Sequence, residues 1–179
     1  ILLGNSITTI ERYAFGNCAI STITIPDSVT TIGDYAFRYI TELETVYVSS
    51  STATTLDLTF GYDQSFFGSI VRIINSYYLD PEPEPEPLSS SDPAFTVFTD
   101  INDTTYVEDV IGELTKTNIT YVMPQNNLKE VRIGTNVTSI GIDTFNSSTE
   151  LQYVNIPDSV TSIGGRAFRY CVKLQAINI

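Results

Sequence analysis

Apolar and polar residues alternate in short stretches that recur along the chain. In the stretch 43–48, apolar residues stand at Leu43, Val46 and Val48, so that its end alternates between apolar and polar. This pattern predicts a short β-strand with one buried face, because successive side chains of a strand point to opposite sides. Four further stretches begin with a large aliphatic residue and end in two aliphatic residues separated by one position. They are 20–25, 128–133, 151–156 and 174–179.

A longer string fills the interval between the predicted strands. Its clearest copy, residues 26–37, reads PDSVTTIGDYAF. Successive copies end in a phenylalanine, and these phenylalanines are 22 residues apart at Phe15 and Phe37 and 23 residues apart at Phe145 and Phe168. A short fixed period predicts a solenoid, in which each repeat forms one coil that packs on its neighbours. The other copies lie at 157–168, 5–15 and, blurred, 136–145.

The apolar positions of each copy predict the interior of the coil. Pro26 and Pro157 follow a strand and end its pairing, because proline has no N–H to donate. Gly33 and its counterparts follow the second apolar residue, where the chain turns or approaches a neighbour closely. We expect the repeat core to consist of Ile23, Ile25, Val29, Ile32, Phe37, Val46, Val48, Val154, Ile156, Val160, Ile163 and Phe168.

The repeated pattern IPDSVTsIGdyAFxxCxxLxxIxI resembles the BspA-type (Treponema pallidum-type) leucine-rich repeat. The match extends over roughly 1–48 and 128–179, and the cysteine of the pattern is present at Cys18 and Cys171 but replaced at Ile40 and Ser148. The resemblance implies an α/β leucine-rich-repeat solenoid, with a parallel sheet on the concave face and short helical turns, 3-10 turns or extended segments on the return side. It also implies an extracellular or cell-surface location and a role in adhesion or protein binding.

The outward residues of the strands are the best candidate for a binding site. Stacked strands place them in columns on one sheet, and solenoids use such concave surfaces to bind ligands. Tyrosine and arginine are enriched in binding hot spots, although the same residues also suit a solvated sheet. The candidate face comprises Thr22, Thr24, Thr45, Tyr47, Glu130, Arg132, Tyr153, Asn155 and Asn178.

Four segments follow one another along the chain. Residues 1–80 form a repeat block whose third unit is degenerate, and 128–179 form a second, open-ended block. Between them lie the segment 81–93, which begins PEPEPEP, and the unrepeated segment 94–127. Alternating proline and glutamate favours a stiff polyproline II spacer over a ligand for a proline-binding groove. This favours two sub-domains with a stiff linker, but the alternative that the blocks stack on each other stays open.

The insert is expected to cap the second block. Phe95–Phe98 predicts a strand, and the spacing of apolar residues at 107, 110, 111 and 114 predicts a helix over 106–114. A second strand is expected at 119–123, ended by Pro124. The chain begins and ends within repeat units, which predicts that neighbouring repeats of a longer parent chain adjoin it.

The composition of the chain argues against several classes of function. The formal net charge is −12, with 9 Lys and Arg against 21 Asp and Glu. This charge argues against nucleic-acid binding and against docking on anionic membranes, and no apolar run approaches the length of a membrane span. The chain has no histidine and no phosphate-binding or nucleophile motif, so we expect neither an enzyme nor a cofactor.

Three local features have ordinary explanations. The acidic stretch 100–109 echoes a calcium loop but lacks its glycine and its final glutamate, so a solvated turn is favoured. Cys18 and Cys171 occupy the same repeat position many coils apart, so we expect two buried thiols and no disulfide. Sequons at Asn102, Asn118, Asn136 and Asn146 matter only where the source glycosylates.

Three functions remain. The favoured hypothesis is a non-catalytic module that binds a protein or a glycan through the concave strand face. The alternatives are a structural spacer or self-associating stalk, and a recognition domain of a larger enzyme.

Overall fold

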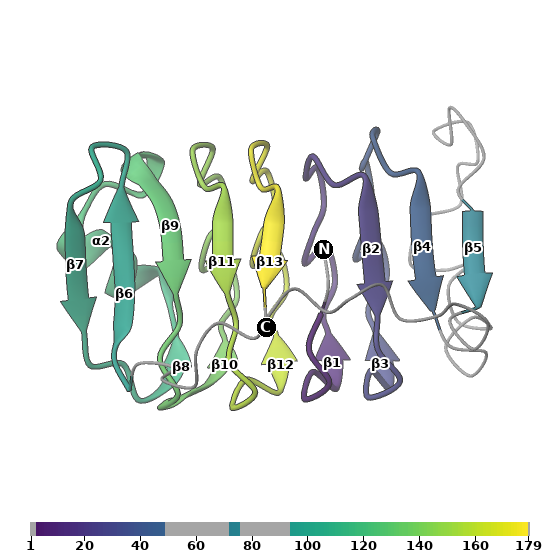
Figure 1. Cartoon of the computed structure of the whole chain (residues 1–179), viewed down its shortest axis with the longest axis horizontal. Helices are drawn as coiled ribbons and strands as arrows, with labels where there is room; N and C mark the ends of the chain where they lie inside the picture. Colours follow the sequence, from purple (N-terminus) through teal and green to yellow (C-terminus); the bar gives the residue numbers. More distant parts are fainter. Residues whose placement is uncertain (1–2, 49–71, 76–93, 179) are drawn as a thin grey trace.

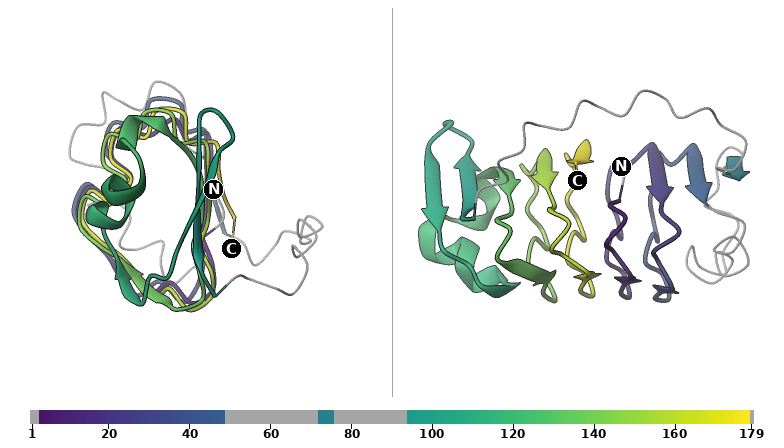
Figure 2. Two further views of the ribbon diagram at one scale, coloured as in Figure 1. Left: turned by 90° about the vertical axis from the view of Figure 1, so that its left-hand side faces the viewer. Right: turned by 60° about the horizontal axis from the view of Figure 1, so that its bottom comes forward.

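A computed structural model describes residues 3–48, 72–75 and 94–178 of the chain, and they form a β-solenoid (Figure 1). Side chains of 48, 72–75 and 176–178 are outside this description. The predicted linker 81–93 and most of the degenerate repeat also lie outside the described residues, so those boundaries stay predictions. Figure 2 shows the coils in projection along the stack, where they superimpose as one closed outline.

Two layers of strands enclose the core. The back sheet has the order β3 (Thr31–Ile32), β1 (Thr9–Ile10), β12 (Ser162–Ile163), β10 (Val137–Ile140) and β8 (Gly112–Leu114), all parallel. The front layer is divided into two sheets. One has the order β2 (Thr22–Ile25), β4 (Thr45–Val48) and β5 (Arg72–Asn75). The other has the order β13 (Ala176–Asn178), β11 (Tyr153–Asn155), β9 (Leu128–Arg132), β6 (Thr96–Asp100) and β7 (Thr105–Glu108).

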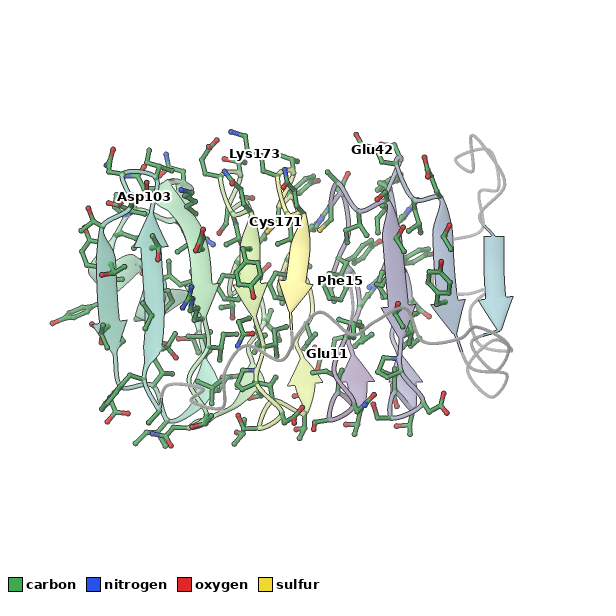
Figure 3. All side chains as sticks on the ribbon, in the orientation of Figure 1. Glu11, Phe15, Glu42, Asp103, Cys171 and Lys173 are labelled. Atoms are coloured by element: carbon green, nitrogen blue, oxygen red, sulfur yellow. The ribbon has the colours of Figure 1, made fainter. Side chains whose placement is uncertain are left out.

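A column of phenylalanine rings runs through the interior. Phe145 stacks on Phe168, Phe168 on Phe15, and Phe15 on Phe37, with ring centroids 5.0, 5.3 and 5.4 Å apart. All four rings are at most 2% exposed. Figure 3 shows the labelled Phe15 inside the stack. Each ring therefore contacts equivalent rings of the neighbouring coils, which makes every coil depend on the next.

The remaining residues of the expected core are also found in the interior. Apart from Ile32, which is half-buried and packs against the core, those with described side chains are buried. Val48 pairs with Ile25 across β2 and β4, but its side chain is outside the described set.

The two repeat blocks stack directly on each other. We call the contact between residues 7–18 and residues 161–171 the seam. Across it β1 pairs with β12 in parallel register, and backbone hydrogen bonds join Thr8 N to Thr161 O at 2.9 Å and Phe168 N to Ala14 O at 2.8 Å. The described parts of the blocks thus form one stack, which is the alternative that the sequence left open and not the separated arrangement that it favoured.

Side-chain sizes are complementary at the seam, because Gly164 and Gly165 of one coil leave room for Glu11 of the neighbouring coil. Glu11 occupies the position that Gly33 and Gly164 hold in other coils. Its carboxylate accepts a hydrogen bond of 2.8 Å from the backbone N–H of Gly165. A Cβ at Gly165 would lie 3.2 Å from Arg12 O and 3.4 Å from the Glu11 carboxylate, so a side chain here would crowd this contact.

Glycines after the second apolar residue are required by close packing. A Cβ on Gly33 would lie 2.5 Å from Arg12 N, and one on Gly164 would lie 2.7 Å from Gly141 C. Neither glycine has a positive φ. The left-handed positions instead flank each phenylalanine, two residues before it and two residues after it, and non-glycine residues hold them. These are Tyr13, Asn17, Tyr35, Tyr39, Asp143, Ser147, Arg166 and Tyr170, with φ between 57° and 66°.

The cap differs from its prediction in two of three elements. The strand expected at 95–98 exists as β6, but residues 106–114 form β7 and β8 and no helix. Gly112 has φ of 81°, which is incompatible with the helix predicted through it. Conversely, the strand expected at 119–123 is largely helix α2 (Lys116–Val122), followed by the 3-10 turn η4 (Gln125–Asn127).

Helix α2 begins at a side-chain cap that the prediction missed. The carboxamide oxygen of Asn118 accepts hydrogen bonds from the N–H of Thr115 at 2.9 Å and from its hydroxyl at 2.8 Å. Ile119 and Met123 are buried and Val122 is half-buried, so the apolar spacing is helical. In the described residues, both helical segments belong to the cap, and the return side of the repeats has short strands and turns. No helix among the described residues is long and apolar enough to cross a membrane.

Candidate functional site: the outward face of the front sheets

Strand register aligns the predicted face residues in pairs. In one front sheet Thr22 lies opposite Thr45, and Thr24 lies opposite Tyr47. In the other sheet, the corresponding pairs are Tyr153 with Glu130 and Asn155 with Arg132, and Asn155 also pairs with Asn178. The structure therefore gathers the predicted residues into two groups, one on each front sheet.

Exposure separates these residues. Arg132 is exposed, whereas Thr24, Tyr47, Glu130 and Tyr153 are half-buried. Their neighbours in the same strands, such as Val46, Val131 and Val154, are fully buried. Asn155 is only 9% exposed and thus offers little surface. The side chain of Asn178 is outside the described set.

The cap hairpin extends the face by two strands that the prediction did not include. β6 pairs antiparallel with β9, which places Val97 opposite Arg132 and Thr99 opposite Glu130. β7 continues the row, with Val107 opposite Val97 and 60% exposed. Burial alternates along residues 96–100 and along 105–108, but the apolar residues of TVFTD and TYVE are adjacent in the sequence. The available signal for the two strands was their content of β-branched and aromatic residues. The helical spacing of 107, 110, 111 and 114 masked the second of them.

The front layer is interrupted at the seam, although the back sheet is continuous there. On that side of β2, Leu3 N donates to Thr24 O at 3.2 Å. A cavity of about 390 Å³ lies beside this contact. Its lining is mixed in polarity and comprises Leu3, Asn5, Thr24, Ile25, Pro26, Asp27 and Ser28.

Asp100, the first residue of the calcium-like stretch, is used within its own turn. Its carboxylate accepts hydrogen bonds from the N–H groups of Asn102 at 2.8 Å and Thr104 at 2.9 Å. The bonds from Thr104 and Asn102 lower the pKa of this carboxyl below its ordinary value. Within the described part of the chain, no group of three or more acidic, cysteine or histidine residues is placed to hold a metal ion.

The two cysteines lie in adjacent coils, and the sequence-based expectation that many coils separate them is wrong. The seam brings them together: the Cys18 thiol donates to Phe168 O at 2.9 Å, and the Cys171 thiol donates to Phe145 O at 3.1 Å. Both are free and buried. Burial raises the pKa of Cys18 to about 12 and raises that of Cys171 well above its ordinary value, so both thiols are poor nucleophiles.

The sequons have different surroundings. Asn102 and Asn136 are exposed in turns. Asn118 caps helix α2, and the side-chain amide of Asn146 donates to Asp143 at 2.8 Å. The first two are therefore the accessible ones.

Comparison with protein families matches residues 1–75 and 117–179 to the BspA type leucine-rich repeat region, in six copies. Neither the curated proteins nor the solved structures contain a match to the chain. The family match accounts for the stacked coils and for the strand, turn and phenylalanine column of each repeat. Because the matched residues make up well over half of its sequence, the chain belongs to the BspA-type leucine-rich repeat family.

Proposed function

We propose that the chain is a non-catalytic binding module that recognises a protein or a glycan through the outward face of its front sheets. The observation that supports this most strongly is the register of the strands, which sets Tyr153 beside Glu130 and Arg132 beside Asn155 and Val97. Repeat proteins bind ligands through such extended surfaces. The concavity implied by the family is part of this proposal.

The residue types support recognition over catalysis. Tyr47, Arg132 and Tyr153 are of the kinds enriched in binding hot spots. The cysteines are buried and their pKa values are raised, so neither is placed as a nucleophile. The family is typically one of binding modules, and a location at the cell surface or outside the cell, as the resemblance implies, belongs to the proposal.

A structural spacer or self-associating stalk is the second candidate. The seam favours it, because a coil near the start of the chain stacks on a coil near its end with the same hydrogen bonds that join consecutive coils. The two candidates differ in their ligand: a spacer needs only further coils, whereas a binding module captures a separate molecule.

The experiment is capture on a glycan array and on an array of purified extracellular proteins. We expect the triple variant Tyr47→Ala, Arg132→Ala and Tyr153→Ala to lose the captured ligand. The control variant changes exposed threonines of the back side, Thr8→Ala, Thr30→Ala and Thr161→Ala, and retains it. Equal capture by both variants contradicts the assignment of the face. A chain that captures nothing and assembles into oligomers in light scattering favours the spacer.

A further inference from the structure

A row of alternating arginine and tyrosine side chains crosses the turns that hold the phenylalanine column. We call it the arginine–tyrosine ladder. Arg169 lies over the rings of Tyr170 and Tyr13, at 4.6 and 5.3 Å from their centroids. Arg12 lies over Tyr13 and Tyr35 at 5.0 and 5.5 Å. Arg38 completes the row over Tyr35 and Tyr39, at 4.7 and 4.5 Å.

The ladder is a composite of both repeat blocks. Tyr13 and Tyr35 stack at 5.3 Å within the first block, and Arg169 of the second block reaches Tyr13 across the seam. Three adjacent coils therefore contribute to one row, and the stacking of the blocks completes it. The proposed binding face is on the strands, so the ladder is a different surface.

Backbone strain marks the same positions. Four tyrosines of the ladder, at 13, 35, 39 and 170, have φ between 58° and 61°. A bulky residue rarely adopts this left-handed conformation, which glycine or asparagine takes more readily. The same conformation recurs at Asn17, Asp143, Ser147 and Arg166 outside the ladder, so it belongs to the turn of every repeat. The tyrosines are thus held where their rings can flank the arginines.

The three arginines of the ladder, like Lys116 and Arg132, form no ion pair with any described residue, whereas three other cations of this acidic chain are paired. Lys129 pairs with Asp103, Arg166 with Asp143, and Lys173 with Glu150. The nearest acid of the seam, Glu11, accepts a hydrogen bond from Gly165 instead. The ladder consequently carries three positive charges that form no ion pair with a carboxylate among the described residues.

The rings fix the arginines and leave donors unused. Arg38 Nη1 donates to the Tyr13 hydroxyl at 3.4 Å, and Arg169 Nη2 donates to the Tyr170 hydroxyl at 3.0 Å. The Nε of Arg169 is buried without a hydrogen-bond partner among the described residues. Each guanidinium has five N–H donors, so most remain free. A guanidinium already held between rings loses less conformational freedom when it binds an anion.

We infer that the arginine–tyrosine ladder binds a sulfated polysaccharide. Guanidinium edges match the oxygens of sulfate and carboxylate groups, and a row along the solenoid suits an extended chain with repeated anionic groups. Tyrosine hydroxyls at 13 and 170 lie beside the guanidinium groups, within reach of sugar hydroxyls.

A polysaccharide fits this surface better than an acidic peptide. The backbone N–H groups of the turns already donate to neighbouring coils, as Phe15 N does to Ala36 O and Asn17 N does to Arg38 O. The apolar side chains of the turns, such as Ala14 and Phe15, are fully buried. The ladder therefore offers neither a strand edge nor an apolar pocket, on which peptide recognition depends.

The net charge of −12 does not prevent this binding. At physiological salt, charges on the protein surface are screened beyond about 8 Å. A ligand on the ladder thus responds mainly to the charges close to it, which are the three arginines and Glu11 beside Arg12, and acids of more distant coils have little effect on it.

The test is the affinity of the whole chain for heparin, measured by calorimetry at about 0.15 M salt. We expect the variant Arg12→Gln, Arg38→Gln and Arg169→Gln to bind at least about tenfold more weakly, because three charge-assisted contacts are lost. Replacement of the same arginines by lysine retains the charge but removes the planar fork, so an intermediate affinity is expected. Thermal melting verifies that each variant folds. If the triple variant does not fold, heparin affinity is measured for Arg38→Gln alone.

The matched control is Lys116→Gln, Lys129→Gln and Lys173→Gln, which changes the net charge by the same amount at lysines outside the ladder. Unchanged heparin affinity in this control, together with no binding of dextran, polyglutamate or single-stranded DNA, supports the inference. Equal loss of heparin affinity in both triple variants would mean that net charge alone determines the binding, and it would overturn the inference. Stronger binding of polyglutamate or DNA than of heparin also overturns the assignment to a polysaccharide.

Discussion

Phe15 and Phe168, from opposite ends of the chain, stack with ring centroids 5.3 Å apart and ring planes 5° apart. This pair has nearly the geometry of Phe15 and Phe37, which belong to consecutive repeats and lie 5.4 Å apart at 7°. The seam thus reproduces the ordinary contact between coils. The arginine–tyrosine ladder depends on it, because Arg169 and Tyr13 come from the two sides.

The phenylalanine pair predicts coupled stability. Phe15→Ala and Phe168→Ala should each reduce the free energy of unfolding by about 3–5 kcal/mol, since both rings are fully buried. The double variant should lose less than the sum by about 0.5–1.5 kcal/mol, the contribution of the aromatic contact. Urea denaturation measures all three values. Phe37 and Phe168 are separated by one coil, so a cycle on that pair should be additive; coupling as large there as at the seam would contradict the stacking order.

Replacement of glycine by alanine should affect stability differently at two positions. Gly33→Ala should destabilise the fold by about 1–3 kcal/mol, because its Cβ would lie 2.5 Å from the backbone nitrogen of Arg12. Gly16→Ala is the matched control, since its nearest contact is 3.4 Å, and it should change stability by less than about 1 kcal/mol. Thermal and urea unfolding of the two variants decide the matter. Equal effects would show that the coils at Gly33 are not packed this closely.

The buried thiols predict a loss of stability in alkali. Burial raises the pKa of Cys18 to about 12, above the ordinary value of 9.0. A raised pKa in the folded state means that the stabilising contribution is complete below pH 9 and is lost as pH rises toward 12, since the unfolded chain then releases protons that the folded chain keeps. For one thiol the slope is about 1.4 kcal/mol per pH unit in this window.

Denaturation between pH 8 and 11 checks this prediction. Cys18→Ala should remove part of the slope, and a further part follows Cys171, whose pKa burial also raises. Both thiols should also resist a thiol reagent at pH 8 in the folded chain and react once urea unfolds it. Rapid labelling of the folded chain would contradict their burial at the seam.

Asp100 predicts the opposite pH dependence in the cap. Hydrogen bonds from Thr104 and Asn102 depress the pKa of its carboxyl, so the stabilisation is present above the ordinary value of 3.8 and is lost as pH falls through the depressed pKa. Asp100→Asn should lower the melting temperature at pH 7 and flatten its decline in acid. Asp109→Asn, which removes a carboxylate of the cap at an exposed position but no hydrogen bond of this turn, is the control and should change the acid profile less than Asp100→Asn. A profile that Asp100→Asn does not alter would contradict the role of this turn.

The repeats could be predicted from the sequence because their signals are local. A strand that alternates, a proline that ends it and a phenylalanine at a fixed spacing each act within one coil, and these residues are buried as the pattern requires. The cap could not be predicted equally well, since residues 106–114 and 116–122 have spacings compatible with both a helix and a strand. Gly112 at φ 81° and the cap at Asn118 decide between them.

The seam and the ladder are harder to predict from the sequence. Repeat coils are nearly interchangeable, so the period alone does not say which coil contacts which. Glu11 opposite Gly165 was the available signal, a glutamate in a glycine position matched by an extra glycine. Arg169 and Tyr13 of the ladder are adjacent in space only after the blocks stack, whereas the outward strand residues share one strand pattern and could be named in advance.

Disulfide trapping of the seam tests the central claim, that the two repeat blocks form one solenoid, most directly. Thr8 N bonds Thr161 O across the seam at 2.9 Å, and Thr30 N bonds Thr8 O within the first block at 2.9 Å. Neighbouring strands are about 4.8 Å apart, within reach of a disulfide. In a Cys18→Ala, Cys171→Ala background, both Thr8→Cys with Thr161→Cys and the control Thr8→Cys with Thr30→Cys should cross-link within single chains on mild oxidation. Cross-linking of the control pair alone, or of the seam pair only between chains, would contradict the account.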